Sequence, residues 1–359
     1  MQNEMNKYYF LLMIGLSFCS CQKEISNTVE RPAEVDVYVA GFVSDGAPDN
    51  GWVPLYDEHP TYWKNGSPVQ LNFDDSRPTD KKSARALSIA VSGNNVYVAG
   101  YQLWLSYNSY LPMGVFWKNG ISADRDSMNL YFTYLLRSLA ISNNDVYIVG
   151  WGTGNEGYWK NENKITLPVY AYTTSITVSG NDVYVAGASS NGGASDVFAT
   201  YWKNGIPVNL TNGSKDANAT SIAVSGADVY VAGSDKDSVA KYWKNGILVN
   251  LTDGSKRGFA ESIAVSETDV YVAGTQWDGM SAGNGNRNPI AIYWKNGNPV
   301  KLTDGSTWAE AKSIAVSGND VYVAGFENGV AKYWKNGNPV ILGDVSKYSE
   351  AWSIFLAPK

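Results

Sequence analysis

A short sequence unit recurs along most of the chain, and its spacing restricts the possible folds more than any other feature. The segment Asp-Val-Tyr-Val-Ala-Gly, or a close variant, occurs seven times with a mean spacing of about 47 residues. Repeats of about 20 to 50 residues are typical of architectures in which each unit packs mainly against its neighbours. The copies begin at Asp36, Asn95, Asp145, Asp182, Asp228, Asp269 and Asp320.

Two further motifs recur equally often. Variants of Tyr-Trp-Lys-Asn-Gly place a tryptophan at Trp63, Trp117, Trp159, Trp202, Trp243, Trp294 and Trp334. Variants of Ser-Ile-Ala-Val-Ser begin at Ser88, Ser138, Ser175, Ser221, Ser262, Ser313 and, in a truncated copy, Ser353. Because three separate motifs agree, seven units are expected between residues 35 and 359.

Each unit is predicted to form four short strands. The first two are rich in β-branched, aromatic and small residues around a Gly-Asn-Asp turn, and the last two flank Asn-Gly, a strong hairpin signal. A proline opens the fourth strand in several units, which places that strand on an outer edge. The predicted fold is therefore all-β, a seven-bladed β-propeller of four-stranded antiparallel blades, with the motif tryptophans packed between or at the rims of blades.

Two units depart from this pattern. The third has Glu162 in place of the turn glycine, so a longer turn is expected there. The second lacks a clear fourth strand after Gly120.

The last unit stops after its first strand, whereas the first unit begins with its second strand. The two incomplete units are predicted to form one blade together, with Ser353 to Leu356 paired to Val37 to Ala40. Such pairing would close the ring and remove the exposed strand edges.

The order of motifs within a unit resembles the extracellular HAF-type repeat. The shared features are Trp-x-Asn-Gly, a leucine before a loop, an Ala-rich strand and a Val-Gly ending, over residues 36–358. The Tyr-rich second strand and the Ser-Gly-Asn-Asp turn differ from that family. The resemblance implies an exported propeller and supplies no catalytic residues to transfer.

The N-terminal segment is predicted to be a lipoprotein signal peptide, residues 1–20. Lys7 precedes an apolar run that is too short to span a bilayer, and Ser20 stands before Cys21. This ending resembles a bacterial lipobox, although Phe18 stands where leucine is usual. The resemblance implies lipidation at Cys21, with ordinary secretion as the alternative.

Residues 21–34 are expected to form the lipidated cysteine and a flexible tether, because they are polar and show no hydrophobic period. The propeller would then lie in the cell envelope, lipid-anchored at the outer membrane and either periplasmic or surface-exposed. Contact with the membrane is expected through the lipid anchor only.

The composition argues against several function classes. A net charge of −6 disfavours nucleic acid as a partner. His59 is the only histidine, and no cysteine follows Cys21, so nucleophilic triads and histidine-based zinc sites are not expected. We expect a monomeric, non-enzymatic propeller without cofactor or metal.

A glycan-cleaving enzyme is the less favoured reading, because it would need a pair of carboxylates and no spacing selects one. The acidic candidates are Asp45, Asp49, Asp57, Glu58, Asp74 and Asp75.

Ligand binding is predicted on the face formed by the connections after second and fourth strands, which vary in length. Aromatic side chains outside the repeat motifs fall there, mixed with Asn, Asp and Gly, and such rings can contact sugars or protein hot spots. Simple packing of these rings around the channel mouth is the main alternative to binding. Among ligands, a glycan or polysaccharide is the first hypothesis and an envelope protein partner the second. The candidate residues are Trp52, Trp104, Trp151, Trp277, Trp308, Trp352 and Tyr107.

Overall fold

A computed structural model describes residues 34–46, 57–73, 83–106, 109–123, 133–152, 157–161, 163–168, 170–190, 197–213, 216–277 and 288–359. These residues form 28 strands in seven four-stranded antiparallel sheets, and they contain no helix. The signal peptide and Cys21 lie outside the described residues.

The first three blades are built as follows. Blade 1 contains β28 (Ser349–Pro358), β1 (Val35–Ser44), β2 (Glu58–Lys64) and β3 (Ser67–Gln70). Blade 2 contains β4 (Ala84–Ser92), β5 (Asn95–Ser106), β6 (Ser109–Lys118) and β7 (Ile121–Ser122). Blade 3 contains β8 (Thr133–Ser142), β9 (Asp145–Gly152), β10 (Gly157–Lys160) and β11 (Asn163–Thr166).

The remaining four blades repeat this order. Blade 4 contains β12 (Ala171–Ser179), β13 (Asp182–Ser190), β14 (Val197–Lys203) and β15 (Ile206–Asn209). Blade 5 contains β16 (Ala217–Ser225), β17 (Asp228–Asp235), β18 (Ala240–Lys244) and β19 (Ile247–Asn250). Blade 6 contains β20 (Gly258–Ser266), β21 (Asp269–Gln276), β22 (Ile290–Lys295) and β23 (Asn298–Lys301). Blade 7 contains β24 (Ala309–Ser317), β25 (Asp320–Glu327), β26 (Val330–Lys335) and β27 (Asn338–Ile341).

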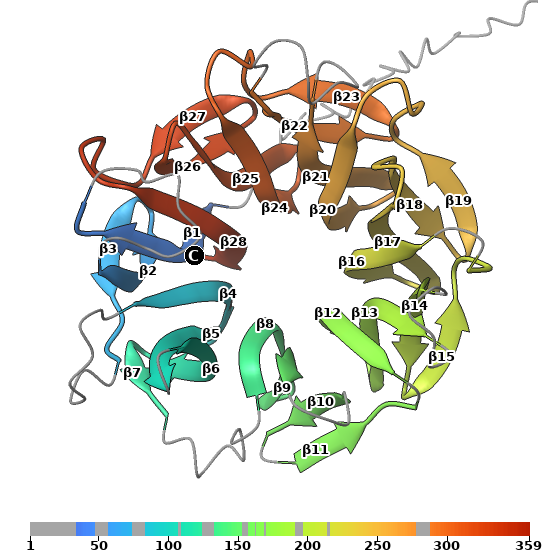
Figure 1. The fold of residues 1–359 in the computed structure, drawn as a ribbon, viewed down its shortest axis with the longest axis horizontal. Helices are drawn as coiled ribbons and strands as arrows, with labels where there is room; N and C mark the ends of the chain where they lie inside the picture. The colour runs from blue at the N-terminus through green and yellow to red at the C-terminus, as the bar shows by residue number, and fades with distance from the viewer. Residues whose placement is uncertain are drawn as a thin grey trace, which may run out of the picture. The chain divides into compact units, whose positions relative to one another are not determined.

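The blades lie in chain order around a ring, with the first strand of each blade innermost and the fourth outermost (Figure 1). The ring belongs to the compact unit Pro32–Lys359. Seven hydrophobic clusters occur in the described chain, one at each contact between neighbouring blades, including the contacts of blade 1 with blades 7 and 2. The predicted seven-bladed propeller is therefore confirmed.

The core lies between blades. At one contact, Ile263, Val272 and Trp294 of blade 6 pack against Tyr230 and Ala240 of blade 5. All seven motif tryptophans occupy equivalent buried positions, with exposed fractions of 0 to 5%. Truncating such a side chain to alanine typically costs about 3–5 kcal/mol, so these rings hold the blades together.

The repeated serine in the middle of each first strand adds a polar link between neighbouring inner strands. The amide N–H of Leu139 in blade 3 donates to Ser88 Oγ of blade 2 at 3.1 Å. Six such bonds join neighbouring inner strands in the described residues. Two of them involve the last strand, from Ile354 N to Ser313 Oγ and from Ile89 N to Ser353 Oγ.

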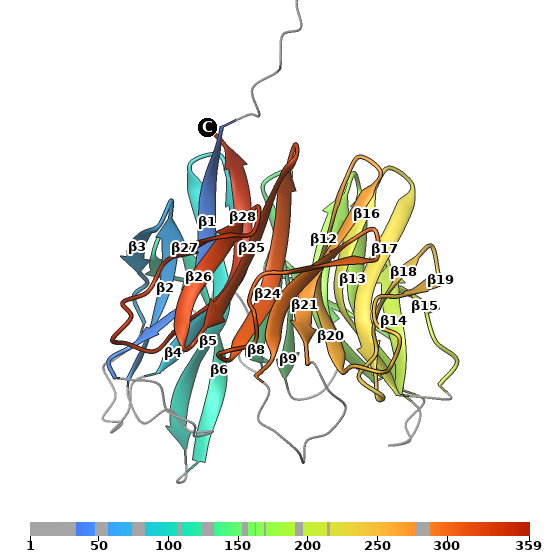
Figure 2. The ribbon, with the colours of Figure 1, turned by 90° about the horizontal axis from the view of Figure 1, so that it is seen from above.

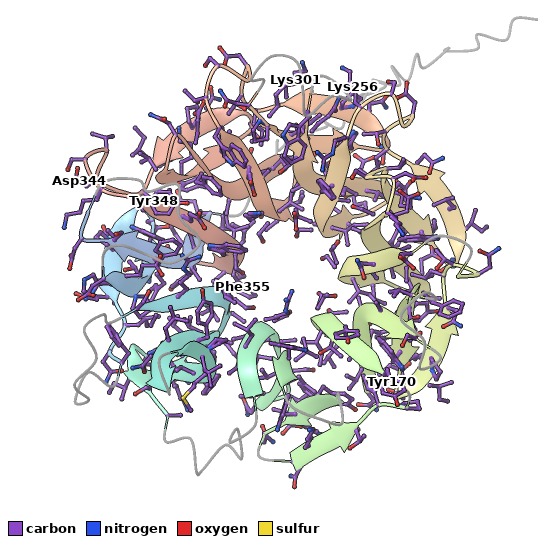
Figure 3. The ribbon with its side chains drawn as sticks, viewed as in Figure 1. Tyr170, Lys256, Lys301, Asp344, Tyr348 and Phe355 are labelled. Atoms are coloured by element: carbon purple, nitrogen blue, oxygen red, sulfur yellow. The ribbon has the colours of Figure 1, made fainter. Side chains whose placement is uncertain are left out.

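Blade 1 closes the ring as expected from the incomplete units. β28 pairs antiparallel with β1, and Ser353, Ile354, Phe355 and Leu356 lie opposite Ala40, Val39, Tyr38 and Val37. Phe355 replaces the small residue of the other inner strands and packs against the clusters of both following contacts, at the channel edge (Figure 3). The closing strand therefore contacts more than its own blade.

The turns after the first and third strands of each blade lie on one face of the ring, and they repeat one polar arrangement. In blade 5, Asn245 has φ +51°, accepts from Val229 N at 2.8 Å and donates to Asp228 Oδ1 at 2.7 Å. Lys244 Nζ lies 2.9 Å from Asp228 Oδ2 and 5.1 Å from the centre of the Tyr230 ring. Six blades have the Asp–Lys pair, and blade 2 has Asn95 instead of the aspartate.

The two irregular units fold with small adjustments. The prediction of a longer turn in blade 3 is wrong, because Lys160 pairs with Asn163 at the same spacing at which Lys64 pairs with Ser67 in blade 1. The strand register is therefore kept despite the lost glycine. In blade 2 the fourth strand is only Ile121–Ser122.

We predict that deleting residues 351–359 opens the ring. The deletion removes Ile354 from the blade 7 contact and leaves β1 with an unpaired edge. Losing that buried packing should cost at least about 5 kcal/mol, or about 10 °C in melting temperature, measured by circular dichroism. Deleting Lys359 alone, whose 3.0 Å ion pair with Glu34 is exposed, should change little. An unchanged melting temperature in the longer deletion would contradict closure by β28.

We predict that the Asp–Lys–Asn arrangement makes stability fall in acid. Hydrogen bonds from Asn245 and Lys244 lower the pKa of Asp228 below 3.8, so its contribution is present above that value and is lost as pH falls through the lowered pKa. Asp228→Asn, which copies Asn95 of blade 2, should lower the melting temperature at pH 7, and the difference from wild type should vanish near about pH 2. A pH-independent difference would exclude this linkage.

Candidate functional site on the long-loop face

We call the side with the connections after second and fourth strands the long-loop face. The strands β5 and β6 extend beyond the other blades on this side, opposite the marked C-terminus (Figure 2). Their pairing continues out to Ser106 and Ser109, so Trp104 lies in a strand that projects from the face rather than in a loop. Trp52 and Tyr107 lie outside the described residues, as does the side chain of Trp104.

The four other candidate tryptophans lie on or near this face. Trp151 is close to the end of β9 and is 38% exposed, and Trp308 directly precedes β24 and is 50% exposed. Trp277 directly follows β21, whereas Trp352 lies inside β28, on an inner strand rather than in a connection. The motif tryptophans are at most 5% exposed, so the two classes of tryptophan have different environments.

Two exposed tyrosines of blade 4 lie close in sequence to the contact between that blade and the end of β9, which carries Trp151. The Thr173 hydroxyl of β12 donates to the Gly150 carbonyl at 3.0 Å, which brings the rim of blade 4 against the end of β9. Tyr170 and Tyr172, next to this contact, are 66% and 52% exposed. The long-loop ends of blades 3 and 4 therefore present several aromatic side chains to solvent.

Trp308 and Trp352 belong to one network across blades 7 and 1, joined by hydrogen bonds, an ion pair and a cation–π contact. The Trp308 indole donates to Glu310 Oε1 at 2.9 Å, and Glu310 also pairs with Lys312. The Lys312 ammonium lies 4.9 Å from the centre of the Trp352 ring, and the Trp352 indole donates to Glu350 Oε2 at 2.8 Å. One face of Trp352 is thus covered by a cation, whereas Trp308 stays exposed.

Burial shifts the protonation of this network. Glu350 is 6% exposed, and its burial raises its pKa above the usual value, against the opposing charge of Arg85 and a hydrogen bond from Tyr348. For Lys312, burial would lower the pKa, but the carboxylates of Glu261 and Glu310 raise it overall. Lys312 therefore stays charged.

A second buried ion pair adjoins this network at blade 2. The Arg85 Nε donates to Glu58 Oε2 at 2.7 Å, and a second guanidinium nitrogen binds Glu58 Oε1. Ser83 Oγ donates to Glu58 at 2.6 Å, and Glu58 is only 2% exposed. The guanidinium also lies 4.3 Å from the centre of the Phe42 ring. Of the acidic candidates from the sequence, Glu58 is thus committed to a buried pair.

A pocket of 310 Å³ opens between blades 5 and 6 on the same face. Its lining comes from the start of β16, the end of β17 and the start of β20. The lining residues are Asp216, Asn218, Thr220, Ser234, Asp235, Lys236, Phe259, Ala260 and Glu261.

The described residues offer no metal-binding cluster of three or more His, Cys, Asp or Glu side chains. The one histidine, His59, lies on β2, where Asp45 Oδ2 is 3.0 Å from Nε2 and Gln70 Nε2 is 3.2 Å from Nδ1. In the same part of the chain, no helix is long and apolar enough to cross a membrane.

Sequence reasoning found part of this face. It located the exposed Trp151 and Trp308, but it missed Arg85, Lys312 and Glu350, and it missed the pocket altogether. A signal existed for the charged residues. Arg85 and Glu350 lie three residues before the repeated serine, and Lys312 lies directly before it. Most units carry neutral side chains at both of these positions.

We predict that Arg85→Met destabilises the protein by about 3–5 kcal/mol, because Glu58 would remain buried without its guanidinium partner. The measurement is chemical unfolding. The double variant Arg85→Met/Glu58→Gln should recover part of the loss, since no unpaired charge remains. Equal loss in the single and double variants would show that the ion pair itself does not cause the effect.

Comparison with known protein families gives a partial match. Residues 84–103 and 309–331 match the LVIVD repeat, a repeat associated with β-propellers. These segments lie on β4–β5 and β24–β26. No curated protein matches the chain.

Several solved structures are similar in fold. The Pyrococcus horikoshii acylaminoacyl peptidase in its orthorhombic crystal form has a TM-score of 0.50 and 11% identity, over 86% of this chain and 51% of that chain. The structure of YjhT has a TM-score of 0.40 and 12% identity over 74% of this chain and 98% of that one. Apo AztD from Citrobacter koseri has a TM-score of 0.40 and 9% identity, over 90% and 98%. The chain spans about half the length of the peptidase, and the similarity shows the propeller fold alone.

Proposed function

We propose that this chain is an exported, lipid-anchored propeller that binds a glycan or polysaccharide on its long-loop face without cleaving it. The observation that carries the proposal is the exposure of Trp151 and Trp308, at 38% and 50%, in a protein that buries its motif tryptophans almost completely. Large aromatic rings left in solvent on a rigid scaffold are typical of binding surfaces.

The chemistry of the face suits a polyhydroxylated ligand. A sugar ring offers an apolar C–H surface to an aromatic side chain and hydroxyl groups to polar neighbours. The exposed Trp308 has the carboxylate of Glu310 fixed at its indole N–H, and that acid is also paired with Lys312. Stacking and hydrogen bonding would therefore be available side by side.

Export and anchoring rest on the sequence. The lipobox-like segment ending at Cys21 and the resemblance to HAF-type extracellular repeats both favour a cell-envelope location. The protein would be held by its lipid at the outer membrane, facing the periplasm or the exterior.

The network around Glu350 favours a second candidate function, cleavage of a glycan. Burial raises the pKa of Glu350, which suits a general acid, and Glu310, paired with Lys312, would supply a second carboxylate. The test is the release of reducing ends from a bound polysaccharide. Activity that disappears in Glu350→Gln would establish cleavage, whereas no release by wild type would leave a binding module.

Screening the purified protein on a glycan array tests the main proposal. Each of Trp151→Ala and Trp308→Ala is expected to weaken binding about threefold to tenfold, because a stacked ring contributes about 0.5–1.5 kcal/mol. Ile247→Ala is a matched control, since Ile247 is 72% exposed but lies on the outer strand β19.

Absence of any glycan binding would overturn the proposal. A protein-interaction scaffold in an envelope complex would then be favoured if a pull-down recovered a partner whose capture depended on Trp308.

A further inference from the structure

We infer that the pocket between blades 5 and 6 is a binding site for one neutral sugar residue. The inference rests on the proposed glycan-binding function and assigns it a specific subsite. Its volume of 310 Å³ lies at the lower end of the range for small-molecule sites, about 300 to 1,000 Å³, which suits a single sugar ring rather than a chain.

One rim position of the pocket carries a small residue where some other blades carry an aromatic ring. The residue after the glycine of the second strand occupies this position. It is Phe42 in blade 1 and Phe326 in blade 7, with exposed fractions of 0% and 6%. Blade 5 has Ser234 there, and its hydroxyl accepts from Ala260 N of β20 at 3.3 Å. Space that an aromatic ring fills in blades 1 and 7 is therefore open in blade 5, and blades 4 and 6 also carry small residues at this position, Ala188 and Thr275.

An aromatic wall borders this space. Phe259 lines the pocket, and its ring meets Trp277 edge to face, with 5.6 Å between ring centres and an interplanar angle of 85°. The Arg257 guanidinium lies 5.6 Å from the centre of the Trp277 ring and 6.0 Å from that of Phe259. Trp277, one of the candidate ligand-binding residues from the sequence, therefore packs against Phe259 and helps to fix the orientation of its ring.

Polar groups surround the opposite side of the pocket. Asp235 is oriented by Lys241 and by Val239 N, at 3.1 Å from its Oδ1. Asp216 Oδ2 lies 3.5 Å from Lys236 Nζ. The amide of Asn218, on an exposed side chain, offers both a donor and an acceptor. Fixed carboxylates accept hydrogen bonds from hydroxyl groups, which a sugar supplies in number.

The charge of the lining selects the class of sugar. Three carboxylates line the pocket, and each has a lysine partner: Asp216 pairs with Lys236, Asp235 pairs with Lys241, and Glu261 lies 4.0 Å from Lys312. These three lysines are committed to carboxylates, so the acid group of a uronic acid would have to displace one of them, whereas the hydroxyl groups of a neutral hexose can donate to the fixed carboxylates. The site is therefore expected to prefer a neutral hexose to a uronic acid.

The pocket is connected to the tryptophan-bearing network. Glu261, in its lining, lies 4.0 Å from Lys312, which covers Trp352. A glycan whose terminal residue occupied the pocket would extend along the long-loop face toward blade 7. The pocket would hold one residue, and the exposed rings would contact the rest of the chain.

Filling the pocket tests the assignment. Ser234→Phe places in blade 5 the residue found at Phe42 and Phe326, and Ile247→Ala on the outer strand β19 is the control outside the pocket. The probes are the methyl glycosides of glucose, galactose and mannose, with methyl glucuronide as the acidic counterpart. Binding is measured by ligand-observed NMR and calorimetry, and thermal unfolding establishes that each variant is folded.

At least one neutral glycoside should bind wild type and Ile247→Ala equally, and should bind Ser234→Phe at least about tenfold more weakly. Phe259→Leu should also weaken binding, and it serves as the test if Ser234→Phe fails to fold. Equal binding by wild type and Ser234→Phe, or tighter binding of the glucuronide, would overturn the inference. If only longer glycans bind, and their binding is lost in Trp308→Ala but unchanged in Ser234→Phe, the pocket assignment fails and the proposed function stands. If no saccharide binds at all, both fail.

Discussion

Packing between neighbouring blades is the interaction on which the rest of the structure depends. Each blade is a single twisted sheet and cannot bury its own faces, so its apolar side chains become a core only against the next blade. Trp294 and its equivalents are almost completely buried at these contacts. A linear array would leave two faces and two edges uncovered, and the pairing of β28 with β1 removes both.

The two faces of the ring differ because they carry different kinds of connection between strands. On the side of the tight turns, an Asn side chain accepts a hydrogen bond from a backbone N–H in every blade, and it lies at a positive-φ turn position that few other residues tolerate. On the long-loop side, the strands continue past the buried layer and the residue after the glycine is free to change. Ser234, Phe42 and Trp151 occupy that one position with different results. The asymmetry needed for recognition is therefore built onto a symmetric core.

The sequence predicted the features that repeat. The four strands of each blade, the burial of the motif tryptophans and the pairing of Ser353 to Leu356 with Val37 to Ala40 all follow from periodicity and closure, and all are confirmed. The bonds of the repeated serine were missed, although the residue was seen, because a strand pattern does not show which neighbour a hydroxyl will meet.

The candidate site was harder to predict because it depends on contacts between units. Glu310, Lys312 and Trp352 come together only when blades 7 and 1 are adjacent. The pocket is lined by Ser234 at a position where Phe42 and Phe326 carry large rings. A serine at a variable position does not indicate a pocket until the blades are compared with one another. Exposure of Trp308 could be anticipated from its position before a first strand, whereas the covering of Trp352 by a lysine could not.

The most direct measurement is NMR of the protein labelled with ¹⁵N in its tryptophan indoles, recorded during titration with a bound polysaccharide. If the long-loop face is the binding surface, the indole signals of Trp151, Trp277, Trp308 and Trp352 should shift with a common affinity, and those of the buried motif tryptophans should stay in place. Saturable binding that shifts none of these four signals, or that shifts mainly the motif tryptophans, would contradict the account.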